Sequence, residues 1–175
     1  CREDGPPCLT CASCRQAQAG SHPDLVELVP GEKGKILVGT HDKEEPGSVR
    51  WLINRLARRS ITGNLGVIID GMETVTPAGQ NALLKTLEEP QQGTCIIIIT
   101  AQRSQLLPTI ISRCTEVPFL PLAEAEVAAV MAQAAPGTGE KIIADISGGS
   151  VERAMIMSDP GVCRDILDRC GAVAL

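Results

Sequence analysis

The sequence predicts an α/β protein in which a parallel sheet with crossover helices is followed by a small all-helical domain. Two observations lead to this prediction. In residues 24–119, apolar runs of strand length alternate with stretches of helical periodicity, as in parallel strands joined by helices. After Leu120 the strand signals stop and only helical stretches follow. We therefore expect two domains, residues 1–119 and 120–175, with a cysteine-rich module at residues 1–14.

Local patterns predict where the helices and strands lie. Strands are expected where β-branched or apolar residues run together, at residues 24–29, 35–38, 65–69, 94–99 and 115–119. Helices are expected where apolar residues recur every three or four positions, at residues 49–57, 78–88, 105–111, 124–134, 140–146, 151–157 and 162–170. Thr76 followed by Pro77 favours a helix start, because the hydroxyl can cap the helix and proline suits its first position.

The composition indicates a globular protein and argues against several functions. Of the 175 residues, 43% are hydrophobic and 21% are charged, which is usual for a globular domain. The net charge of −5 argues against a large surface that tracks nucleic-acid phosphates, and Trp51 and Phe119 are too few aromatics for base stacking. Uninterrupted apolar runs such as residues 95–99 are far shorter than the roughly 20 residues of a membrane helix. We expect a cytoplasmic protein, and further sequence before Cys1.

The cysteines favour a metal site. Four of the eight lie within the first fourteen residues: Cys1, Cys8, Cys11 and Cys14. Four thiolates close a tetrahedral zinc site with no open position, so the predicted zinc is structural rather than catalytic. The alternatives are unliganded thiols or thiols oxidised to disulfides. His22 and His41 are predicted to be isolated surface residues, because neither falls at ligand spacing.

The predicted strand at 65–69 ends at Asp70 and resembles the second nucleotide-binding strand of P-loop ATPases, whose Asp helps to hold magnesium. Active ATPases of the AAA+ class normally carry Glu directly after this Asp. Here Gly71 takes that place, and Glu73 comes too late in the sequence. The phosphate-binding loop G-x-x-x-x-G-K-[ST] is not in the 175 residues.

A more specific resemblance follows. The segment Asn-Ala-Leu-Leu-Lys-Thr-Leu-Glu-Glu-Pro at 81–90 resembles the signature helix of the bacterial DNA polymerase III clamp-loader subunits, gamma/tau and delta-prime. Ser112-Arg113-Cys114 resembles their Ser-Arg-Cys motif, the cysteine cluster resembles their zinc module, and residues 18–24 resemble the delta-prime stretch after it. These motifs occur in the family's order over nearly the whole chain.

The resemblance implies an AAA+ core, incomplete at its N-terminus, with a helical lid from Leu120 onward. Arg113 would be an arginine finger, which contacts the γ-phosphate bound to a neighbouring subunit and can accelerate hydrolysis there by about 10³–10⁵. Thr100 matches the sensor-one position, and with Asp70 it would belong to a vestigial nucleotide site. The implied partners are the gamma/tau and delta subunits and, through the assembly, the sliding clamp and primer-template DNA.

Two departures favour the delta-prime type, which does not hydrolyse ATP. Gly71 breaks the acidic pair, and Glu152 stands in the lid where gamma-type subunits carry a nucleotide-sensing Arg. A carboxylate beside a triphosphate repels it, and Arg153, one position later, points about a quarter-turn away on a helix. We therefore expect this chain to be part of the polymerase holoenzyme, supporting clamp loading without binding or hydrolysing ATP itself.

Two other interpretations remain open at the level of sequence. A gamma/tau-type ATPase would carry its phosphate-binding loop upstream of Cys1. A free-standing zinc module that binds nucleic acid is disfavoured by the net charge of −5.

Overall fold

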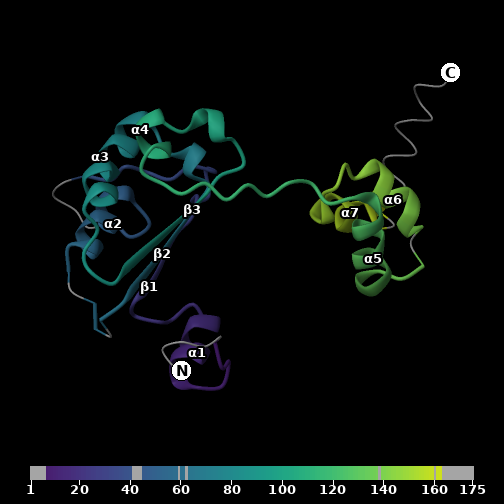
Figure 1. The fold of residues 1–175 in the computed structure, drawn as a ribbon, viewed down its shortest axis with the longest axis horizontal. Helices are drawn as coiled ribbons and strands as arrows, with labels where there is room; N and C mark the ends of the chain where they lie inside the picture. Colours follow the sequence, from purple (N-terminus) through teal and green to yellow (C-terminus); the bar gives the residue numbers. More distant parts are fainter. Residues whose placement is uncertain are drawn as a thin grey trace. The chain divides into compact units, whose positions relative to one another are not determined.

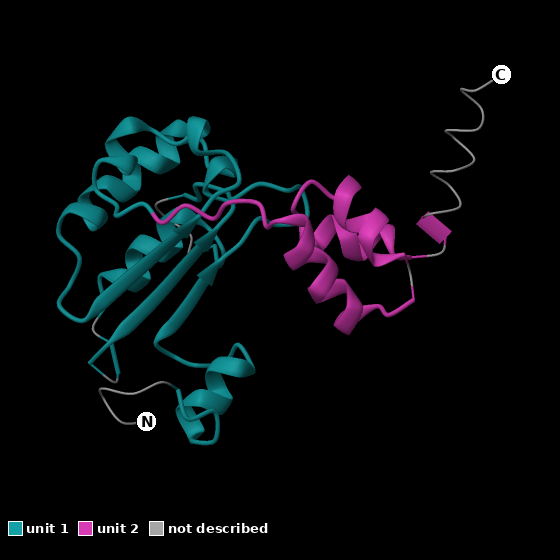
Figure 2. Cartoon of the chain, turned by 45° about the vertical axis from the view of Figure 1, so that its right-hand side comes forward, with its two compact units in different colours: residues 1–116 teal, residues 117–175 magenta. Residues whose placement is uncertain are grey.

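The structure is a computed structural model that describes residues 7–40, 45–58, 60–61, 63–137, 139–159 and 161–162. The chain divides into two compact units, residues 1–116 and 117–175 (Figure 2). The first unit contains a parallel sheet with helices, and the described part of the second unit contains helices and their connections.

The first unit is built on a three-stranded parallel sheet with the strand order β1-β2-β3. Its strands are β1 (Leu25–Leu28), β2 (Leu65–Asp70) and β3 (Thr94–Ile99). Leu25 pairs with Gly66, and Leu65 pairs with Thr94, so the carboxyl ends of the strands lie at one edge of the sheet. The strands predicted at 24–29, 65–69 and 94–99 are therefore confirmed, and so is the α/β fold.

Helices cover one face of this sheet (Figure 1). The helical elements of the first unit are α1 (Ala12–Gln18), α2 (Val49–Leu56), η1 (Met72–Thr74), α3 (Pro77–Glu88), η2 (Arg103–Gln105) and α4 (Pro108–Ile111). The core between the sheet and α2, α3 and α4 is aliphatic and includes Val26, Leu28, Leu52, Val67, Ile69, Leu83 and Ile110. Each such side chain contributes about 1.5–3 kcal/mol when fully buried, so packing among aliphatic residues replaces the missing aromatics.

The predicted start of α3 is confirmed. The Thr76 hydroxyl accepts a hydrogen bond from the Gly79 N–H at 3.4 Å, and Pro77 is the first helical residue. Gly79 itself lies where the helix packs most closely. A Cβ there would stand 2.7 Å from Val75 Cγ1 and 3.1 Å from Val38 Cγ2, so a larger residue would force these side chains to move.

Three predicted elements differ from the structure, and proline explains two of the differences. Residues 115–119 form no strand, because Pro118 has no N–H to donate to a ladder. The helix predicted at 105–111 begins only at Pro108, since the residue before a proline is disfavoured in the helical conformation. Residues 35–38 contribute a single bridge, between Leu37 and Ser48, rather than a strand.

In the second unit, three helices pack around a small core. These are α5 (Glu124–Ala134), α6 (Glu140–Ile146) and α7 (Val151–Met157), which confirm the predicted helices at those positions. The core consists of Val127, Met131, Ile143, Ala144 and Ala154. The helix predicted at 162–170 lies outside the described residues except for its first residue. Among the helices described in the two units, none has the length and apolar character needed to cross a bilayer.

A buried amide fixes α3 relative to the segment that leads into α4. Gln80 is 1% exposed. Its Nε2 donates to the carbonyl oxygens of Val75, at 3.1 Å, and Gln105, at 3.2 Å. Its Oε1 accepts from the Leu107 N–H at 2.8 Å. One side chain therefore satisfies one backbone group before α3 and two backbone groups between β3 and α4.

We predict that Gln80→Leu lowers the free energy of unfolding by about 2–4 kcal/mol, because it removes all three hydrogen bonds and leaves their backbone partners unpaired. Urea unfolding of the full-length protein, followed by circular dichroism, measures the change. The matched control is Gln102→Leu at an exposed glutamine, which should change the value by no more than about 0.5 kcal/mol. Equal losses in the two variants would contradict the role assigned to Gln80.

Candidate functional site

The carboxyl ends of β2 and β3 bring together two residues of the predicted nucleotide site. Asp70 is the last residue of β2 and pairs with Ile99 of β3, so Thr100 follows directly on the adjacent strand. Asp70 is exposed and Thr100 is half-buried. In open parallel sheets, ligands bind beyond the carboxyl ends of the strands. Both residues lie at the edge where such a site is expected.

The structure adds Glu73 to this edge. The Thr100 hydroxyl donates a hydrogen bond to Glu73 Oε2 at 2.7 Å, and it accepts one from the Gln102 N–H at 3.2 Å. Glu73 is too far along the sequence to form an Asp-Glu pair with Asp70, but in the folded chain its carboxylate reaches the next strand. Sequence reasoning missed this contact because it counted positions and did not allow for the turn after β2.

Hydrogen bonds keep the Glu73 carboxyl ionised. Partial burial raises its pKa, but hydrogen bonds from the Thr100 hydroxyl and from the backbone N–H groups of Glu73 and Ala101 outweigh this effect. The net result is a pKa below the ordinary value for glutamate. The edge therefore carries a fixed negative charge beside Thr100.

Gly71 makes the turn that places Glu73 there. Its φ is 74°, in the left-handed region that glycine adopts without steric cost. A Cβ at this position would lie 2.9 Å from Cγ of Pro30. The backbone and Pro30 thus exclude an unstrained Glu from the position where active AAA+ ATPases carry one.

Arg113 lies just beyond α4, with its guanidinium held at the surface. Its Nε donates to Glu88 Oε1 at 2.8 Å, and its Nη2 bonds to the same oxygen. Its Nη1 donates to the Thr109 carbonyl oxygen at 2.8 Å. The Arg113 side chain is 31% exposed and that of Glu88 is 46% exposed. Sequence reasoning missed Glu88 as a partner, because no local pattern connects residues 25 positions apart.

Three of the four predicted metal ligands form one cluster. The Sγ atoms of Cys8, Cys11 and Cys14 all lie within 4.8 Å of one another, and those of Cys8 and Cys14 are 4.0 Å apart. Thiolates on a tetrahedral zinc, with Zn–S bonds of about 2.3 Å, stand about 3.8 Å apart. The donor set and its spacing therefore fit a zinc ion. Cys1 lies outside the described residues.

Hydrogen bonds near the start of α1 stabilise sulfur atoms of this cluster and so favour metal binding. Cys11 is the residue that caps α1, and its Sγ accepts a hydrogen bond from the Cys14 N–H. Backbone N–H groups of Thr10 and Cys11 donate to Cys8 and lower the pKa of its thiol to about 6. This lowered pKa favours the thiolate form of Cys8, which is the form that binds metal.

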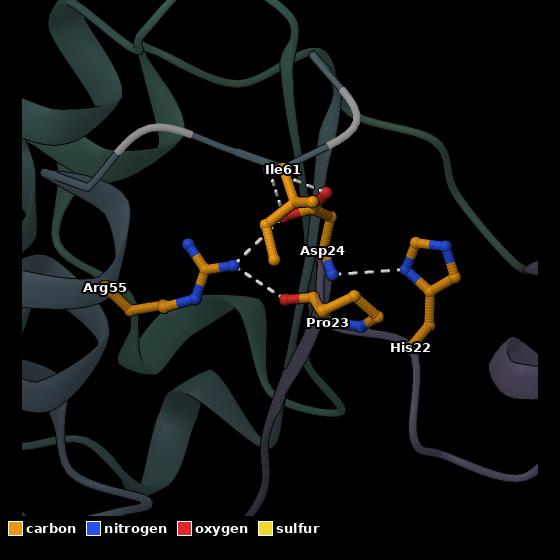
Figure 3. A network of polar contacts seen from close by, with 5 residues as sticks. All are labelled: His22, Pro23, Asp24, Arg55 and Ile61. Atoms are coloured by element: carbon orange, nitrogen blue, oxygen red, sulfur yellow. Dashed lines mark hydrogen bonds and ion pairs between the residues drawn. The ribbon is translucent and has the colours of Figure 1, made fainter.

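A polar network joins the cysteine module to the sheet, and Figure 3 shows the part of this network around Asp24. The buried Asp24 carboxylate accepts hydrogen bonds from the Ile61 N–H at 3.0 Å and from Arg55 Nη2 at 3.1 Å. His22 Nδ1 accepts from the Asp24 N–H at 3.1 Å, and its Nε2 lies 3.2 Å from the hydroxyl of Ser13 in α1. The prediction that His22 is an isolated surface residue was wrong. His41 lies outside the described residues.

The predicted lid residues lie on α7 of the second unit. Glu152 and Arg153 are both exposed in its first turn, where the Arg153 N–H donates to the capping hydroxyl of Ser150 at 3.2 Å.

An open parallel sheet with helices and with polar residues at the carboxyl ends of its strands defines an α/β protein of the class that binds ligands at this edge. The structure is similar to that of a point mutant of RuvB from Thermotoga maritima, with a TM-score of 0.51 and 15% sequence identity, over 90% of this chain and 60% of that one. The family described as DNA polymerase III, delta subunit, matches residues 1–123, and the chain belongs to this family.

Several curated relatives are named as the subunit delta' of DNA polymerase III, which makes the resemblance more specific. The chain is 42% identical over 108 residues to the DNA polymerase III subunit delta' of Yersinia pestis, covering 61% of this chain and 30% of the relative. It is 35% identical over 124 residues to the subunit delta' of Bacillus subtilis, covering 70% of this chain and 35% of the relative. The chain thus spans about a third of the length of the curated relatives it matches.

We predict that Thr100→Val raises the pKa of Glu73 toward the ordinary glutamate value, because the mutant lacks the hydroxyl that stabilises the carboxylate. A pH titration followed by carboxyl-carbon NMR measures this pKa. The matched control, Thr100→Ser, retains the hydroxyl and should keep the pKa low.

The lowered pKa of Glu73 also makes the stability of the fold depend on pH. A carboxyl with a lowered pKa stabilises the fold above its unfolded pKa, and this stabilisation is lost as the pH falls through the folded pKa. Thr100→Val should therefore lose stability at neutral pH relative to Thr100→Ser, with a smaller difference below the pKa of Glu73. An unchanged Glu73 titration in Thr100→Val would contradict the contact.

Proposed function

We propose that this chain is part of a delta'-type clamp-loader subunit, which supports ATP-dependent loading of the sliding clamp without hydrolysing ATP itself. The observation that carries the proposal is the position of Arg113. It is an exposed arginine directly after a short helix, in a chain that belongs to the DNA polymerase III delta-subunit family. From this position it serves as an arginine finger on the nucleotide of a neighbouring subunit.

The chemistry of a guanidinium suits this role. Its planar donors match phosphate oxygens, and its charge stabilises the negative charge that develops on the transferred phosphoryl group. Arg113 needs no deep pocket for this, since its target comes from another subunit. An exposed side chain next to the end of a helix is available for a contact between subunits.

The turn at Gly71 supports a subunit that does not hydrolyse ATP. The Glu that orients the attacking water in active AAA+ ATPases is replaced by a glycine with φ 74°. Asp70 and Thr100 then belong to a vestigial nucleotide site, where Glu73 holds the Thr100 hydroxyl. Charge repulsion between Glu73 and a triphosphate also disfavours nucleotide binding at this edge.

The partners in this proposal are the gamma/tau and delta subunits, and the clamp and primer-template DNA through the complete assembly. In this proposal, clamp loading takes place in the cytoplasm. Residues 1–119 form the AAA+ core and residues 120–175 form its helical lid. The relatives named as subunit delta' support this assignment.

The cysteine cluster in this proposal is a structural zinc site with Cys1 as the fourth ligand. Four thiolates leave no open coordination position, so the metal would have no catalytic role. The ion would hold α1 and the preceding loop together, and the His22–Asp24 network joins this module to the sheet.

We predict that Arg113→Ala lowers the DNA-stimulated ATP turnover of a reconstituted clamp loader while leaving its assembly intact. The site served by the finger should lose about 10³–10⁵ in rate, so that total turnover falls while the other sites continue. Arg113→Lys should not restore the rate fully, because an ammonium lacks the planar fork. Steady-state ATP hydrolysis by complexes of equal composition is the measurement.

The matched control is Arg103→Ala. Arg103 is also an exposed arginine of the first unit, paired with Glu116 at 2.8 Å, and its loss should leave turnover unchanged. If Arg113→Ala supports wild-type turnover in a complex that contains this subunit, Arg113 is a structural residue and the finger assignment is wrong.

We also predict one zinc ion per chain in protein purified under reducing conditions without a chelator. Cys14→Ser should lose the metal, because it removes the buried ligand of the cluster, whereas Cys114→Ser, outside the cluster, should retain it. Elemental analysis of the purified full-length variants measures the content. Absence of zinc from the wild-type protein would refute the metal assignment.

A further inference from the structure

The ion pair with Glu88 occupies the same N–H donors of Arg113 that an arginine finger uses to bind phosphate oxygens. Nε and Nη2 form the edge of the guanidinium that binds two oxygens side by side. In this structure, both donate to Oε1 of Glu88. The remaining nitrogen, Nη1, donates to the carbonyl oxygen of Thr109. Each of the three nitrogens is therefore already engaged within its own subunit.

Glu88 stands at a position on its helix where a carboxylate is unfavourable without a positively charged partner. Glu88 is the last residue of α3, where the partial negative charge of the helix end disfavours a carboxylate. Arg113 supplies the opposite charge that offsets this cost. Lys85, in the same last turn, favours the helix end as usual. Glu88 is thus a locally unfavourable residue whose described ion pair is with Arg113.

We infer that Glu88 is a positioning residue for Arg113, which holds the guanidinium in a resting orientation and competes for it with the γ-phosphate of the neighbouring subunit. This inference rests on the proposed role of Arg113 as a finger. Before engagement, the Nε–Nη2 edge is occupied by Glu88. Engagement requires those two donors to exchange the carboxylate oxygen for phosphate oxygens.

The exposure of the pair makes such an exchange feasible. The two side chains are 31% and 46% exposed, so water and salt screen their attraction. A terminal phosphate with its metal-bound neighbours offers several oxygens instead of one. The resting pair is therefore strong enough to bias the orientation of Arg113 and weak enough to be displaced.

The test compares Glu88→Gln with wild type in a reconstituted clamp loader. Glutamine keeps the size of the side chain but removes its charge, so Arg113 should spend more time free to engage the phosphate. We expect ATP turnover without DNA to rise about two- to fivefold, the factor that corresponds to one exposed ion pair. The rise should shrink toward none as the ionic strength increases, since salt already weakens the pair in the wild type.

Glu89→Gln is the matched control. Glu89 is the next residue, it is exposed, and within the described residues it forms no hydrogen bond or ion pair with Arg113. Its neutralisation changes the net charge by the same amount and should leave turnover unchanged. In an Arg113→Ala background, Glu88→Gln should also have no effect, because the residue it releases is gone.

A second measurement addresses the contact without ATP. In the isolated full-length subunit, the Arg113 Nε–H should exchange with water faster in Glu88→Gln than in wild type or Glu89→Gln. NMR of the arginine side chains detects this exchange. Equal exchange rates in all three proteins would overturn the inference, whatever the role of Arg113 in the assembly.

The outcomes separate this inference from the proposed function. If Arg113→Ala lowers turnover but Glu88→Gln leaves it unchanged or lowers it, the finger stands and the competition by Glu88 is wrong. If Arg113→Ala leaves turnover unchanged, both fail. A rise in Glu88→Gln that persists in the Arg113→Ala background would assign Glu88 an effect unrelated to Arg113 and would also overturn the inference.

Discussion

The position of α3 relative to the segment that leads into α4 depends on the buried amide of Gln80. A glutamine is both donor and acceptor, so it satisfies two carbonyl groups and one N–H group without placing a charge in the core. It joins α3 to the segment between β3 and α4. Since α3 ends at Glu88 and α4 leads to Arg113, the distance between those two side chains depends on the same set of bonds.

The elements that sequence could predict are those fixed by local chemistry. The β-branched run at 94–99 forms a strand, and Thr76 with Pro77 starts a helix, because the physical preference lies within a few neighbouring residues. The cysteine spacing likewise brings three thiols together, since the turn before α1 is short. The resemblance to the clamp-loader family placed Asp70 and Thr100 in one site, and the parallel pairing of β2 with β3 brings both to the same edge of the sheet.

The features that sequence reasoning missed depend on longer-range geometry or on a single residue within a favourable pattern. Pro118 prevents a strand in a run whose other residues favour one. Glu73 reaches Thr100 only because a left-handed turn redirects the chain. The pairing joins Glu88, at the end of α3, to Arg113, just after α4. Strand β3 separates these two segments in the sequence, so no local periodicity predicts the contact.

The turn at Gly71 also bears on how such subunits change over evolutionary time. One substitution, Gly71→Glu, is the shortest path to the acidic pair of the active AAA+ ATPases. In this backbone the glutamate residue would have to adopt φ 74°, at a cost of about 1–2 kcal/mol. Its Cβ would also lie 2.9 Å from Cγ of Pro30. Replacing Glu with glycine meets neither obstacle. Once the turn and Pro30 fit a glycine, a return to Glu at position 71 costs stability whereas the opposite change does not, so substitution at this position is biased in one direction.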